Sequence, residues 1–125
     1  MDPFPIGLYT IFFEFMRTNV LQGNEPWKTA FNDLKKQTSL NFVSCPIAFV
    51  SEDAYGVNSF GGKEFYQSAM AAYKHSLVWY ITKDQVYADK AIEILNAWAY
   101  KLHSFDANNA KLNVGLWGYY FLNAA

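Results

Sequence analysis

The chain has 125 residues, enough for one domain with a single hydrophobic core. Hydrophobic residues make up 52% of it and aromatic residues 19%, a composition that excludes an intrinsically disordered protein. Its 10 basic and 11 acidic residues give a net charge of −1, so neither a nucleic acid nor a membrane is expected as a partner.

Residues 1–9 are expected to be irregular, and residues 10–125 to form the domain. The apolar stretch Ile6–Met16 contains Glu14 and lacks a small-residue cleavage site, so no signal peptide is visible. This stretch is also too short for a membrane span. A first helix is predicted from Thr10 to about Gln22, ended by Gly23. Its apolar side would carry Phe12, Phe15, Met16 and Val20.

A second helix is predicted from the stretch Asn24-Glu25-Pro26-Trp27, which is typical of a cap followed by a first-turn proline. It would continue to about Lys36. Its buried stripe would consist of Trp27, Ala30, Phe31 and Leu34.

The stretch Gln37–Gly62 has no helical period, apart from a weakly strand-like piece at Phe42–Val50. Such long irregular segments are uncommon in compact domains and often functional. Ser51–Gly62 is therefore either a binding loop or lid, or a disordered connector, and the two interpretations carry equal weight.

Two further helices are predicted after this stretch. Lys63–Ile81 is apolar almost all round, so it should be covered on more than one side. A tight turn follows, with Asp84 as the cap of a helix that runs to Leu102. The buried face of that helix would carry Ala88, Ala91, Ile92, Leu95, Ala99 and Leu102.

A polar loop is predicted at Ser104–Ala110, followed by a last helix at Lys111–Ala125. This helix lacks a glycine cap and a terminal basic residue, and its apolar face continues to the end of the sequence. We therefore expect an exposed apolar patch there, and self-association through it.

Three stretches in chain order carry a resemblance to a known family: YGVNSFGG (55–62), AAYKHSLVWYITKDQVYADKAIEILNAW (71–98) and LNVGLWGYYFLNAA (112–125). With the preceding Phe-Met-Arg helix and Glu-Pro-Trp-Lys turn, they resemble the amino-terminal part of the alginate lyase superfamily, in its secreted fungal and bacterial form. The likeness covers roughly Phe13 to Ala125. Family members usually begin with a His-Pro-Gly-Leu-like sequence, where this chain has Met-Asp-Pro-Phe-Pro-Ile-Gly-Leu.

The resemblance implies an all-α fold, namely a partial (α/α) toroid of antiparallel helical hairpins with one long irregular loop. It also implies an extracellular polysaccharide lyase that acts by β-elimination on a uronic-acid polysaccharide such as alginate. The positions to which the resemblance would assign catalysis lie beyond Ala125. The chain is therefore expected to be an amino-terminal fragment, truncated at its carboxyl end and inactive alone.

β-Elimination needs a group that neutralises the uronate carboxylate, a base for the C5 proton and an acid for the departing oxygen. A surface ion pair is the expected role of Arg17, and a hydrogen-bonded structural role that of His75. His103 follows a helix end, where a cation suits the dipole. No tyrosine is visibly paired with a histidine or arginine, so no catalytic residue is assigned. Since Cys45 is the only cysteine, no metal or other cofactor is expected.

Sugars have flat apolar faces ringed by hydroxyls, so a carbohydrate groove combines aromatic rings with amide groups. The candidate contacts for an acidic polysaccharide are Tyr55, Asn58, Trp79, Tyr80, Asn96, Trp98, Trp117 and Tyr120. Aromatic residues at helical spacing more often belong to a core, so packing between helices is favoured for the three tryptophans. Asn96 is expected to bind a nearby backbone or loop group.

Two alternatives come from other classes. Residues 71–95 also resemble one tetratricopeptide unit, which would make the chain a helical protein-binding module. A solenoid needs about three copies, and a shift of about 34 residues brings no second copy into register. A glycosidase would require two carboxylates across a cleft, whereas Glu52 and Asp53 are adjacent.

Overall fold

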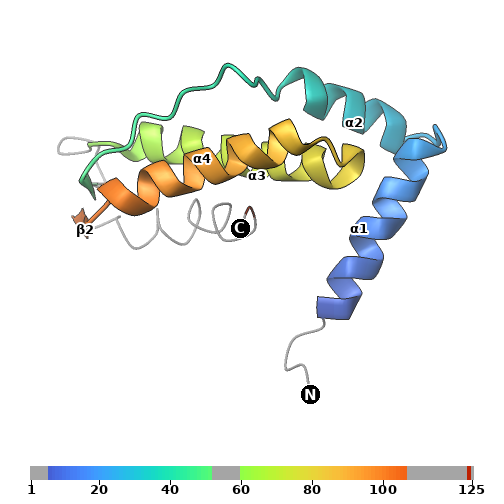
Figure 1. The fold of residues 1–125 in the computed structure, drawn as a ribbon, viewed down its shortest axis with the longest axis horizontal. Helices are drawn as coiled ribbons and strands as arrows, with labels where there is room; N and C mark the ends of the chain where they lie inside the picture. Colours follow the sequence, from blue (N-terminus) through green and yellow to red (C-terminus); the bar gives the residue numbers. More distant parts are fainter. Residues whose placement is uncertain (1–5, 52–59, 107–123, 125) are drawn as a thin grey trace.

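The computed structural model describes residues 6–51, 60–106 and 124. These residues form a mostly helical structure, as predicted (Figure 1). The elements in chain order are α1 (Ile6–Leu21), α2 (Trp27–Lys36), β1 (Phe49–Ser51), α3 (Gly62–Thr82), α4 (Gln85–Lys101) and β2 (Ser104–Asp106).

Helices α3 and α4 form an antiparallel hairpin joined by Lys83 and Asp84 (Figure 1). Lys83 ends α3 in a left-handed conformation (φ 59°), and its backbone N–H donates to the Trp79 carbonyl at 2.6 Å. Asp84 then caps α4, since its Oδ1 accepts from the Val86 N–H at 3.3 Å. The predicted cap is confirmed, and it explains why a two-residue connection suffices here.

The interior of α3 matches the prediction of a helix covered on several sides. Its buried residues are Phe65, Ser68, Ala69, Ala72, His75, Val78 and Ile81. The small side chains of Ser68, Ala69 and Ala72 allow close approach by neighbouring elements, and Phe65 packs edge-to-face on Trp98 of α4 at 5.5 Å between ring centroids.

The predicted buried face of α4 is confirmed for Ala91, and Leu95 and Leu102 pack against the core, but the prediction is wrong for Ile92 and Ala99. The buried residues are Tyr87, Ala91, Ile94 and Trp98, whereas Ile92 is 52% exposed and Ala99 is exposed. Turning the helix this way buries two large rings instead of alanine methyl groups, and therefore removes more apolar surface from water.

Strands β1 and β2 pair in parallel at the open end of the hairpin, with Val50 opposite Phe105. The ladder extends outward through the His103 N–H, which donates to the Ala48 carbonyl at 2.7 Å. β1 overlaps the end of the weakly strand-like piece predicted at Phe42–Val50, whereas Ser104–Asp106, predicted to lie in a polar loop, forms a strand, and that prediction is wrong. Backbone pairing with β1 makes Ser104–Asp106 a strand, although three residues are too few for their own sequence to indicate one.

The core lies between the hairpin and this small ladder. Its buried cluster consists of Val50, Phe65, Ala72, Ile94 and Trp98, with Phe42, Ile47, Ala71, Leu95, Leu102 and Ala124 packed around it. The segment 37–48 follows the hairpin from α2 back to β1 and supplies two of these covering residues (Figure 1).

Helices α1 and α2 are much more exposed. α1 begins at Ile6, four residues before the predicted start, and Phe12 and Phe15 on its predicted packing side are 60% and 54% exposed. α2 has the predicted bounds, but none of its residues is buried: three of the predicted stripe are half-buried and Ala30 is exposed. Its N-cap is Pro26, without a side-chain cap, so the predicted cap followed by a first-turn proline is wrong.

The predicted last helix, 111–125, lies outside the described residues except for Ala124. The Ala124 carbonyl accepts a hydrogen bond from the Ser76 hydroxyl at 3.0 Å. The expected apolar patch and self-association through this helix therefore stay predictions.

Candidate functional site

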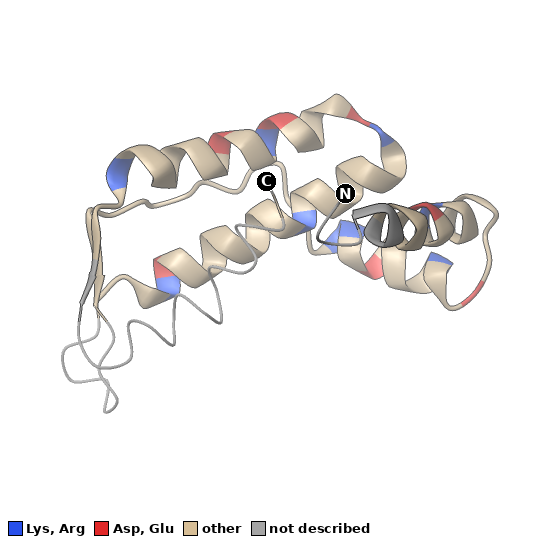
Figure 2. Ribbon diagram, turned by 90° about the horizontal axis from the view of Figure 1, so that it is seen from below, with Lys and Arg blue, Asp and Glu red and all other residues tan. Residues whose placement is uncertain are grey.

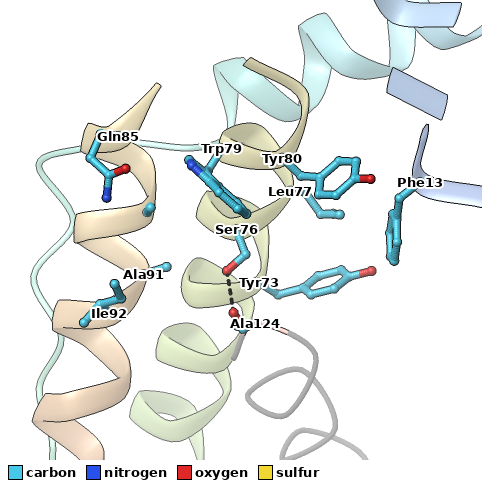
Figure 3. A pocket seen from close by; sticks show the side chains of 11 residues that line it. Phe13, Tyr73, Ser76, Leu77, Trp79, Tyr80, Gln85, Ala91, Ile92 and Ala124 are labelled. Atoms are coloured by element: carbon cyan, nitrogen blue, oxygen red, sulfur yellow. Dashed lines mark hydrogen bonds between the residues drawn. The ribbon is translucent and has the colours of Figure 1, made fainter. Parts of the chain in front are cut away.

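A hollow of about 420 Å³ lies on the hairpin near the α3–α4 turn (Figure 3). Four aromatic side chains line it: Phe13 from α1, and Tyr73, Trp79 and Tyr80 from α3. Gln85, Ala88, Ala91 and Ile92 of α4 line the side opposite, with Ser76 and Ala124 between them. The hollow thus combines flat apolar rings with a few polar groups, as small-ligand sites do.

Lys83 brings a positive charge to two of these rings. Its Nζ lies 3.9 Å from the centroid of the Tyr80 ring and 4.6 Å from that of Trp79. The two rings are themselves edge-to-face, with centroids 6.3 Å apart. Because an ammonium above a ring face is attracted to the π-electrons, the three side chains form one unit at the end of α3.

Tyr80 also joins α3 to α1. Its hydroxyl donates to Glu14 Oε1 at 2.6 Å, and its ring lies 5.4 Å from that of Phe13. Burial raises the pKa of Tyr80, and the hydrogen bond and negative charge of Glu14 raise it further, whereas the positive charge of Arg17 lowers it. The phenol therefore keeps its proton at neutral pH and acts there as a donor, not as a base.

Within the described ranges, Arg17 does not form the surface ion pair expected from the sequence. Its Nε donates to the Ile81 carbonyl in the last turn of α3, at 3.1 Å. Carbonyl groups at a helix end lack intrahelical partners, and the helix dipole favours a cation there, so this position suits a guanidinium. Arg17 is consequently near enough to Tyr80 to affect its pKa, a pairing that the sequence did not reveal.

His75 has the structural role predicted for it. The ring is 1% exposed, with Nδ1 2.6 Å from the Ala71 carbonyl oxygen and Nε2 3.0 Å from that of Ser39. The Nε2 contact joins the segment after α2 to α3, whereas the Nδ1 contact lies within α3. His103 is exposed beyond the end of α4, away from the residues that line the hollow.

The structure brings together only part of the predicted contact set. Trp79 and Tyr80 line the hollow, whereas Trp98 is 3% exposed in the core, as the packing interpretation predicts. Asn96 is exposed on α4 and does not line it. Tyr55, Asn58, Trp117 and Tyr120 lie outside the described residues.

Several residues at the site were missed in the sequence. Phe13 and Glu14 come from α1, and their proximity to Tyr80 depends on how α1 meets α3, which no local pattern reveals. Lys83 could have been found, because it follows Trp79 and Tyr80 by four and three positions, the spacing at which helical side chains meet.

The predicted binding loop is described only at its ends. Ser51 and Phe60 form an antiparallel bridge, with N–H to carbonyl distances of 2.9 and 2.7 Å. Beside it, a second hollow of about 630 Å³ is lined by Cys45–Ile47 and Phe60–Glu64. It carries fewer aromatic residues than the first, so we take the first as the candidate site.

The described part of the chain shows no sign of a charged interface, a metal site or a membrane span. Each of the four helices carries both acidic and basic residues, which are interspersed in Figure 2. Within the described ranges, no group of three or more His, Cys, Asp or Glu side chains is arranged to hold a metal ion. None of the helices described has the length and apolar character needed to cross a bilayer.

Comparisons of the chain with protein families, with curated proteins and with solved structures gave no match. The likeness to alginate lyases therefore stays a prediction.

Proposed function

We propose that this chain is part of an extracellular polysaccharide lyase of the alginate lyase type and contributes to the binding of an acidic polysaccharide. The observation that carries the proposal is the aromatic hollow at the α3–α4 turn, with the Lys83 ammonium on its Trp79 and Tyr80 rings. Aromatic rings suit the apolar faces of sugars, and a cation suits a uronate carboxylate. The choice of an acidic polysaccharide as the polymer comes from the resemblance of residues 55–62, 71–98 and 112–125 to alginate lyases.

In this proposal the α3–α4 hairpin is one of the antiparallel hairpins of an (α/α) toroid. The reaction removes the C5 proton of a uronate, forms a double bond between C4 and C5, and expels the glycosidic oxygen from C4 with a proton. None of these steps is assigned to a described residue, because both ring nitrogens of His75 lie against backbone carbonyl oxygens and the Tyr80 hydroxyl donates its proton to Glu14 in a hydrogen bond. The chain alone should therefore bind the polymer without cleaving it.

The test is a titration of the purified 125-residue chain with oligomannuronate, followed by tryptophan fluorescence. Trp79→Ala should weaken binding roughly tenfold, since a stacking ring is lost. The matched control is Trp27→Ala, because Trp27 is half-buried on α2 against Phe15 and does not line the hollow. Absence of binding, or equal weakening by both substitutions, would refute the proposal. Formation of unsaturated product by the chain alone would refute the claim of inactivity.

The tetratricopeptide-like alternative is favoured by one observation, the exposed apolar side of α1. Ile11 is 68% exposed, and Phe12 and Phe15 are similarly accessible. A surface of this kind is typical of protein-binding sites. For that alternative the chain should bind no oligosaccharide, so the same titration separates the two functions.

A further inference from the structure

Two cations lie next to residues that line the hollow, and neither forms an ion pair with a carboxylate of the described residues. Among the described residues the one salt bridge joins Lys90 to Glu93, so neither Lys83 nor Arg17 is neutralised by an ion pair there. Glu14, the nearby carboxylate, accepts its hydrogen bond from the neutral Tyr80 hydroxyl instead. The group of Glu14, Arg17 and Lys83 therefore has an excess of positive charge beside an aromatic hollow.

The backbone determines where the ammonium lies. Lys83 occupies the left-handed position at the end of α3, which glycine or asparagine usually fills. Its N–H donates to the carbonyl of Trp79, and its side chain lies against the rings of Trp79 and Tyr80. A lysine here thus keeps a charge on two rings that line the hollow, at a conformational cost that asparagine would reduce.

An ammonium held over ring faces can still bind a ligand. It has three N–H donors, and the rings interact with its charge without accepting all of them. Lys83 is not itself part of the lining, but its ammonium lies on the rings of Trp79 and Tyr80, so a sugar chain that extends from the hollow past these rings reaches it. A neutral hydroxyl gains a weak hydrogen bond from this ammonium, whereas a carboxylate gains a charge-assisted one.

We propose that Lys83 is the residue by which this site selects uronate over neutral sugars, through pairing of the ligand carboxylate with its ammonium. This inference rests on the proposed function. Arg17 is a less suitable partner, since its Nε already binds the Ile81 carbonyl.

The experiment compares two ligands of equal linkage and length, an oligomannuronate and the neutral manno-oligosaccharide, by calorimetry at low salt. The measured quantity is the ratio of their dissociation constants. Lys83→Gln should lower the preference for the uronate roughly fivefold and leave binding of the neutral sugar unchanged. Lys83→Arg should retain the preference. The control, Lys101→Gln, removes a lysine at the far end of α4 and should change neither constant.

Lys83→Asn provides a second neutral variant that suits the left-handed backbone, so loss of selectivity in it cannot be attributed to misfolding. An unchanged ratio in both neutral variants would overturn the inference, as would an equal loss of affinity for both sugars. Equal binding of the two sugars by the unaltered chain would overturn it while leaving carbohydrate binding intact. Absence of binding to either sugar would refute the proposed function, and the inference with it.

Discussion

The α3–α4 hairpin and the α1–α2 pair differ in how much of their apolar surface they bury. Seven residues of α3 and four of α4 are buried, whereas α2 has none and Phe12 of α1 is 60% exposed. The hairpin is covered by β1 and by the segment after α2. The contacts of α1 with α3 come from Phe13, Glu14 and Arg17, which meet the carboxyl end of α3. Apolar sequence alone therefore does not determine burial; a covering element must be available.

This difference predicts unequal responses to the same substitution in the two regions. Ile94→Ala, in the core of the hairpin, should lower the free energy of unfolding by about 2–5 kcal/mol, because it leaves a cavity. Ile11→Ala, on the exposed side of α1, should change it by less than about 0.5 kcal/mol. Urea denaturation of the two variants measures both values. A comparable loss in Ile11→Ala would show that the α1 surface is covered in solution.

The same contrast explains which parts of the fold could be predicted from sequence. The starts of α3 and α4 follow local rules, since Gly61 is the N-cap of α3 and Asp84 caps α4 with its side chain. Pairing of β1 with β2 joins residues about 55 positions apart, between segments with no alternating pattern, so local chemistry could not reveal it.

Prediction of the candidate site was limited in the same way, because local sequence patterns do not reveal contacts between distant segments. Trp79 and Tyr80 are candidates because their residue types suit a sugar, and both line the hollow, although packing between helices is the favoured interpretation for Trp79. The buried roles of His75 and Trp98 are predictable because both lie in apolar helices. The contribution of α1 was missed, because it depends on tertiary contacts between half-buried side chains. The spacing of its alanines predicts one buried face for α4, whereas burial of the much larger Tyr87 ring favours a slightly rotated face.

One glycine in each region allows the stability effect of the same substitution to be compared: Gly61 at the start of α3, and Gly23 between α1 and α2. Gly61 and Gly23 both have positive φ, 79° and 75°, so alanine is strained at either position. A Cβ at Gly61 would collide with Ile47 Cδ1, whereas at Gly23 the nearest atom, Lys28 Cδ, is 3.9 Å away. Gly61→Ala should therefore cost about 2–3 kcal/mol and Gly23→Ala about 1 kcal/mol of stability.

Thermal unfolding of both alanine variants tests this expectation. A third variant combines Gly61→Ala with Ile47→Val, which removes the colliding methyl group and should recover part of the loss. If Gly23→Ala proves as damaging as Gly61→Ala, the collision contributes nothing and backbone strain accounts for both effects.

The smallest expected effect concerns the contact between the two regions, the Tyr80–Glu14 hydrogen bond. The pKa of Tyr80 is raised in the fold by burial and by Glu14, so the unfolded chain loses the phenolic proton first. Stability from this group is complete below the unfolded pKa of about 10 and is lost as the pH rises through the folded value. The melting temperature should therefore fall more steeply as the pH rises above about 10 than in Tyr80→Phe, which has no proton to lose. Tyr100→Phe, at a residue 83% exposed, should follow the unaltered chain.

Parallel curves for the unaltered chain and Tyr80→Phe would mean that α1 does not hold Glu14 against Tyr80 in solution. The exposed helix would then not be fixed to the hairpin at this point.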